Sequence, residues 1–104
     1  MDPLDLNSYK ALFLKSSSGF LKEIKDNLSS NGNNKDLHRL FHNLKGQALF
    51  MNLGDTGQLC LTAEKIMEDF INGEIPLDAT TKNQLSEIIV KIELSLKKYE
   101  SINS

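Results

Sequence analysis

Hydrophobic residues recur at helical spacing in four segments of the chain, near residues 7–29, 35–53, 55–72 and 79–99. No segment alternates as a strand would. Four amphipathic helices joined by short links predict an all-α fold, an antiparallel four-helix bundle. The expected inward positions are Leu6, Tyr9, Phe13, Phe20, Ile24 and Leu28, then Leu37, Leu40, Phe41, Leu44, Ala48 and Met51, then Leu59, Ala63, Ile66, Met67 and Phe70, and finally Leu85, Ile88, Ile89, Ile92, Leu96 and Tyr99.

Polar residues and glycines mark the breaks between these segments. Asn31-Gly32-Asn33-Asn34 is a strong turn signal, because both residue types accept left-handed backbone angles. The stretch 16–19, three serines and a glycine, is where the first helix would bend. Further along, Gly54 ends the second segment, Asp55 or Thr56 is expected to cap the third helix, Gly73 to end it, and Asp78 to cap the fourth.

His42 is out of phase with the hydrophobic positions of its own segment. At roughly 100° per residue, it lies about 150° around the helix axis from the centre of the apolar stripe. A histidine so placed faces water or a partner rather than the core. The residues alone leave two interpretations open: a reactive, accessible histidine, or an ordinary solvated one.

Two neighbours of His42 share its face of the helix. Lys45 and Gly46 follow at the spacings that bring helical side chains together. A glycine inside a helix costs about 0.5–1 kcal/mol relative to alanine, so some benefit should offset it. We interpret Gly46 as space through which another protein approaches His42, the alternatives being a tolerated glycine or a close helix crossing.

Composition narrows the classes of function. The chain has 104 residues, which predicts one domain over 1–104, and its net charge of −2 with 25% charged residues gives no basic stripe for nucleic acid. Cys60 is the only cysteine, so there is no intramolecular disulfide and no thiolate cluster for zinc. The apolar runs are too short for a membrane span and the N-terminus lacks a secretion signal, so we expect a cytoplasmic protein.

Cofactor and metal motifs are missing from the sequence. It contains no Glu-x-x-His pair for a di-iron bundle and no glycine-rich phosphate loop, so no ATP site is expected. His38 and His42 stand four residues apart, but the remaining ligands of a zinc site are not evident. We therefore predict no cofactor and no metal.

The segment from Leu40 to Glu64, headed by His42-Asn43-Leu44-Lys45-Gly46, resembles histidine-containing phosphotransfer (HPt) domains. It is most similar to the N-terminal phosphotransfer domain of chemotaxis-type histidine kinases. The likeness extends over essentially the whole chain, including the first helix around Phe13 and Phe20 and the link 73–78.

The resemblance implies a role for several residues. His42 would accept a phosphoryl group from the ATP-binding domain of a histidine kinase and pass it to the aspartate of a response-regulator receiver domain. Lys45 would contact the phosphoryl oxygens, and Glu64 would orient the imidazole. The chain would be a carrier with no ATP site of its own, either free-standing or the N-terminal part of a kinase.

Three positions depart from the family pattern. Asn52 replaces a frequent glycine near the end of the second helix, Leu61 stands where chemotaxis-type domains often carry a second histidine, and Leu49 is larger than usual. On a helical projection Leu49 and Leu53 fall within about 20° of His42. We therefore expect partners to dock on Gly46, Leu49, Leu53 and His38. The alternative is a helical interaction module that is never phosphorylated; an independent enzyme is less supported.

Overall fold

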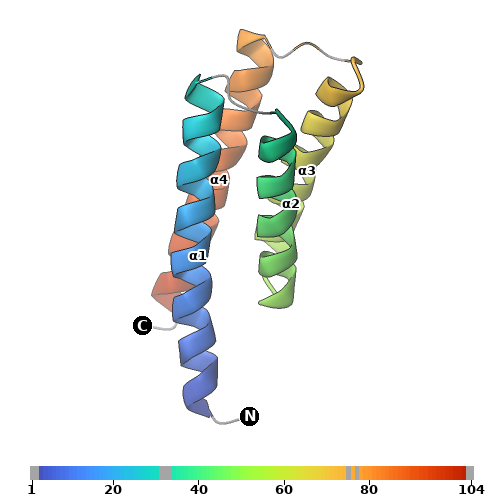
Figure 1. Cartoon of the computed structure of the whole chain (residues 1–104). Coiled ribbons are helices and arrows are strands. Elements are labelled where there is room, and N and C mark those ends of the chain that lie inside the picture. The colour runs from blue at the N-terminus through green and yellow to red at the C-terminus, as the bar shows by residue number, and fades with distance from the viewer. Residues whose placement is uncertain (1–2, 31–33, 75, 77, 103–104) are drawn as a thin grey trace.

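Four helices run antiparallel to one another in chain order in the computed structural model (Figure 1). They are α1 (Pro3–Ser30), α2 (Asn34–Phe50), α3 (Gly54–Ile71) and α4 (Ala79–Ile102). The structure describes residues 3–30, 34–74, 76 and 78–102, and these contain no strand. The predicted all-α helical bundle is confirmed.

A single hydrophobic core lies where the four helices meet. Each helix contributes its apolar stripe, as the sequence pattern predicts for helices that bury one face. The closest pairing is between α2 and α3. The buried core residues are Phe13, Leu21, Ile24, Leu28, Leu37, Leu40, Phe41, Leu44, Ala48, Cys60, Ala63, Met67, Leu85, Ile89, Ile92 and Leu96.

The first helix differs from the expectation at its N-terminal end. It has 28 residues against 17 in α2, and its first turns project beyond the end of α2 (Figure 1). Tyr9, assigned to the core from its spacing, is 44% exposed because no neighbouring helix covers it. α1 runs as one helix through residues 16–19, where Ser17 is buried. The side chain of Leu6 and the turn residues 31–33 lie outside the described part.

A short left-handed turn joins α2 to α3. Asn52 has φ of 61°, and asparagine is the residue that tolerates this conformation best after glycine, which explains why it stands where a glycine is frequent. α2 ends at Phe50, so the expected extension to Leu53 is wrong. The predicted caps Asp55 and Thr56 are also wrong: Leu53 occupies the N-cap position, with no side-chain hydrogen bond.

The connection from α3 to α4 follows the predicted signals. Gly73 has φ of 79° and its N–H donates to the carbonyl oxygen of Phe70, which ends α3 as a helix-terminating glycine does. Asp78 Oδ1 accepts from the backbone N–H of Thr81 at 2.9 Å, so Asp78 caps α4. Of the predicted link, Ile75 and Leu77 are outside the described residues. None of the helices described has the length and apolar character needed to cross a membrane.

Candidate functional site

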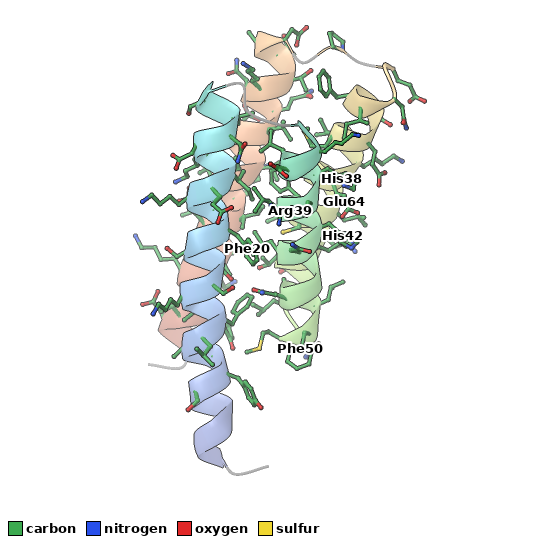
Figure 2. The ribbon with its side chains drawn as sticks, in the orientation of Figure 1. Phe20, His38, Arg39, His42, Phe50 and Glu64 are labelled. Atoms are coloured by element: carbon green, nitrogen blue, oxygen red, sulfur yellow. The ribbon has the colours of Figure 1, made fainter. Side chains whose placement is uncertain are left out.

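His42 projects from the outer side of α2, and 60% of its side chain is exposed. α3 lies beside α2 and directs Glu64 toward it (Figure 2). His42 Nδ1 is 2.7 Å from Glu64 Oε2, a short hydrogen bond of the kind that forms when one partner is charged. The outward phase predicted for His42 is confirmed.

Glu64 is a buried carboxylate at the centre of this site. Only 7% of its side chain is exposed, and its second oxygen, Oε1, accepts from Lys45 Nζ at 2.9 Å. Burial alone would raise the pKa of Glu64, but hydrogen bonds from Lys45 and His42 and their favourable charge outweigh burial and hold the pKa below its ordinary value. Glu64 is therefore ionised at neutral pH.

An ionised Glu64 determines where the proton of a neutral His42 ring resides. A carboxylate can only accept hydrogen bonds, so Nδ1 carries the proton and donates it to Oε2. Nε2 then keeps its lone pair on the other side of the ring. Because the ring is mostly exposed, this nitrogen is available to a reagent that approaches from solvent.

Lys45 is tied to the site by an ion pair with Glu64. It is not a solvated lysine, since only 20% of its side chain is exposed, and its ammonium group is held by Glu64. The sequence placed Lys45 beside His42 but could not show that both contact the same carboxylate. The ammonium group lies at the edge of the site, tethered to the carboxylate that orients His42.

Gly46 opens the side of the site that faces α1. A Cβ atom added at Gly46 would meet no heavy atom within 4 Å, so neither helix packing nor a close crossing requires a glycine here. Beside it, a groove of about 710 Å³ runs between α1 and α2. His42 and Gly46 lie on one wall, and Tyr9, Leu12 and Phe50 contribute apolar surface to the groove.

A comparison with families of known proteins matches this chain to one of them, the Hpt domain, over residues 8–94. The chain belongs to the Hpt domain family. Hpt domains act in two-component phosphorelays as histidine phosphotransfer modules, together with kinases and receiver domains. Neither the curated proteins nor the solved structures yielded a match.

The predicted docking residues of this Hpt domain fall into different environments. Leu49 is 52% exposed, in agreement with its phase on α2. Leu53 is partly exposed but packs against the core, so it offers less surface than Leu49, and its part in docking stays a prediction. The helical projection fails at Leu53 because α2 ends three residues earlier and the chain turns at Asn52.

His38 lies one turn before His42 on α2 and is half-buried. Its Nε2 is 3.2 Å from Glu68 Oε1, one turn beyond Glu64 on α3, so two histidine–glutamate pairs lie side by side. Sequence reasoning missed Glu68, although its spacing of four from Glu64, matching the spacing of His38 and His42, is a signal that could have indicated it.

Two further residues near the site were also missed. Phe50 is 81% exposed at the end of α2, next to the groove (Figure 2). Its phase, away from the apolar stripe of α2, is the sequence signal that could have indicated a contact surface. Gly57 is buried beneath Leu49, and nothing in the sequence indicates that relationship. Cys60 is enclosed in the core, where burial and the charge of Glu64 raise its pKa to about 12, against the opposing charge of Lys45.

Proposed function

We propose that the chain is a phosphorelay intermediate in which His42 accepts a phosphoryl group from a histidine kinase and transfers it to a receiver-domain aspartate. The observation that carries the proposal is the exposed His42 ring whose Nδ1 is bound by buried Glu64. Among the described residues only His38 offers a second imidazole, and its Nε2 is paired with Glu68. The chain most resembles the N-terminal phosphotransfer domain of chemotaxis-type histidine kinases, which makes it either a free-standing carrier or part of such a kinase.

The first step forms a bond between nitrogen and phosphorus. The lone pair of His42 Nε2 attacks the γ-phosphorus of ATP held by the kinase, and the bond from phosphorus to the ADP oxygen breaks. The ring gains positive charge as it is phosphorylated. Glu64, at 2.7 Å from Nδ1, stabilises that charge and fixes the ring for in-line attack.

The second step returns the site to its starting state. A carboxylate oxygen of the receiver attacks phosphorus, the bond from Nε2 to phosphorus breaks, and His42 becomes neutral again. Lys45 supports both steps by a charge-assisted hydrogen bond to the phosphoryl oxygens. Its ammonium group has three N–H donors, so it can make this bond while it still donates to Glu64. No ATP site is needed in this chain, because the kinase supplies it.

The groove between α1 and α2 is the surface we assign to the receiver. It adjoins His42, its wall is open at Gly46, and its apolar residues Leu12 and Phe50 are 62% and 81% exposed. An apolar patch next to a reactive group is typical of a recognition surface. Leu49 and His38 lie outside the groove, on the side of α2 that faces α3, and we assign them to the edge of the same docking surface.

Labelling with kinase and radioactive ATP tests the proposal. The parent chain should acquire a label that is lost in acid and kept in base, as expected for phosphohistidine, and His42→Gln should acquire none. His38→Gln should still become labelled. Glu64→Gln should slow labelling by roughly tenfold, the usual cost of losing a residue that orients a reactive histidine. Equal labelling of the parent and His42→Gln would refute the assignment of His42, whereas a parent that acquires no label would leave the interaction module as the better explanation.

A further inference from the structure

Two residues of the α2–α3 surface take part in no bond-making step of the proposed phosphotransfer. His38 and Glu68 form a pair next to that of His42 and Glu64, and the two imidazole rings are stacked with centroids 6.4 Å apart and planes inclined by 10°. Both His38 and Glu68 are accessible, with 29% and 52% of their side chains exposed. These residues therefore present potential ligand atoms beside the reacting histidine.

Three ligand atoms of this cluster lie close together. One atom each of His38, Glu64 and Glu68 are all within 4.8 Å of one another. Ligand atoms in a tetrahedral zinc shell are roughly 3.3–3.5 Å apart, as bond lengths of about 2.0–2.2 Å require. His38 Nε2 and Glu68 Oε1, at 3.2 Å, are already close to this separation. The other two pairs of ligand atoms lie within 4.8 Å, so each would need to close by up to about 1.5 Å to complete the shell.

The charge of the cluster favours a cation. Glu64 and Glu68 carry two negative charges, and the ammonium group of Lys45 pairs with one of them. Glu64 is buried, so an ion bound to it is poorly screened by solvent. Glu68 is exposed and can adjust to close the shell. One imidazole nitrogen and two carboxylates suit Zn²⁺ or Co²⁺, whereas Mg²⁺ demands an octahedral shell of oxygen ligands.

We propose that His38, Glu64 and Glu68 form a binding site for a divalent transition-metal ion such as Zn²⁺, and that its occupation restrains phosphotransfer by His42. Both oxygens of Glu64 are already in use, Oε2 by His42 and Oε1 by Lys45. An ion bound to either oxygen draws electron density from the carboxylate and repels the ammonium group of Lys45, which weakens these contacts. The ligand set was invisible in the sequence because α3 supplies two of its three members. The slowing of phosphotransfer rests on the proposed function, whereas the binding of the ion does not.

Calorimetric titration of the full chain with Zn²⁺ tests the site. We expect one ion per chain, and affinity reduced by more than about tenfold in His38→Gln and in Glu68→Gln. Glu87→Gln, an exposed glutamate on α4, is the matched control and should bind as the parent does. Visible absorption of bound Co²⁺ should report a tetrahedral shell. Equal affinity in all variants, or a loss in His42→Gln as large as that in His38→Gln, would overturn the ligand set.

A second measurement tests the restraint. For each protein, the rate of labelling by kinase and ATP is measured with and without Zn²⁺, and the ratio of the two rates is compared. The ratio does not depend on how fast each variant is labelled in the absence of metal. The rate should fall roughly tenfold in the parent and remain unchanged in Glu68→Gln, which also excludes an effect on the kinase. If the parent binds Zn²⁺ but keeps its rate, the restraint is refuted. If the parent is never labelled, the proposed function fails while the calorimetric result stands.

Discussion

The side chain of Leu49 occupies the space that a Cβ atom at residue 57 would need: such an atom would lie 2.6 Å from Leu49 Cδ2 and 3.0 Å from Cγ. The glycine at this buried position of α3 lets α2 approach closely, and the leucine that fills the gap remains half-exposed. Residue 57 and residue 49 should therefore be energetically coupled.

A double-mutant cycle measures this coupling. Gly57→Ala alone should leave the free energy of unfolding unchanged or lower it, because the clash with Leu49 offsets the gain in helix propensity. In a Leu49→Ala background the same change should stabilise by about 0.5–1 kcal/mol, the propensity difference between glycine and alanine. Urea unfolding of the four proteins gives the values. Equal effects of Gly57→Ala in both backgrounds would show that the contact carries no energy.

Gly46 provides a way to separate folding from partner access. Because a Cβ atom at Gly46 meets open space, Gly46→Leu should keep or raise stability, by up to about 1 kcal/mol, yet place a bulky side chain beside His42. Phosphotransfer should then fall by at least about tenfold, measured as the labelling rate. Gly19→Leu is the matched control, since Gly19 is also a helical glycine with open space and lies outside the groove. Transfer at the parental rate in Gly46→Leu would refute the close-approach argument.

Glu64 should give the protein a defined loss of stability in acid. Its pKa in the fold lies below the ordinary 4.5, so the unfolded chain takes up the proton first as the pH falls. The stabilisation is complete above about pH 4.5 and disappears as the pH drops through the lower pKa of the folded state. At neutral pH, Glu64→Gln should cost about 1.5–3 kcal/mol, the typical contribution of a hydrogen bond to a charged group.

Urea titrations of the parent and Glu64→Gln from neutral pH to about pH 3 test this prediction. The difference between their unfolding free energies should shrink as the pH falls below 4.5. Other carboxylates, including Asp78 with its lowered pKa, are present in both proteins and cancel in the difference. A difference independent of pH would show that the ionised form of Glu64 is not favoured in the fold.

Phe50 should contribute to receiver binding without contributing to the core. It is 81% exposed, so Phe50→Ser should leave the thermal midpoint nearly unchanged. Its burial at an interface is worth up to about 1.5–3 kcal/mol before ordering costs, and each 1.4 kcal/mol is tenfold in affinity. We expect the dissociation constant of a receiver domain, measured by titration, to rise roughly tenfold. Val90→Ser on α4 is the control, since Val90 is also an exposed apolar residue, and it should leave the dissociation constant unchanged. Equal affinities of the parent and Phe50→Ser would show that the groove is not the receiver-binding surface.

The hydrophobic period predicted the elements well because it reports directly on which face of a helix is buried. Leu37, Leu44 and Ala48 of α2 are buried as expected, and His42 is exposed as expected. The expectations of burial fail where the neighbouring helix does not cover a residue, or where the helix that carries the pattern has already ended. Tyr9 has the correct period but lines the open groove between α1 and α2 instead of the core, and Leu53 follows a turn that a projection of α2 cannot represent.

The candidate site was only partly visible in the sequence, for a different reason. Residues on one helix, such as His42 and Lys45, have a relative position fixed by their spacing. Glu64 and Glu68 stand on another helix, and their meeting with α2 depends on how far α3 is rotated and shifted. Only the resemblance suggested Glu64, and nothing suggested that Lys45 would share it.

The turn at Asn52 joins the two helices that carry the reacting groups. Every group of the reaction stands on the α2–α3 hairpin, whose register this turn sets. One residue inserted into α3 between this turn and Glu64 would move Glu64 by about 1.5 Å along the helix and roughly 100° around it, which would dismantle the site without altering any of its side chains. The apolar surface of Tyr9 and Leu12, by contrast, belongs to α1 and carries none of the reacting groups. Such an insertion would thus abolish phosphotransfer while leaving the α1 wall of the groove in place.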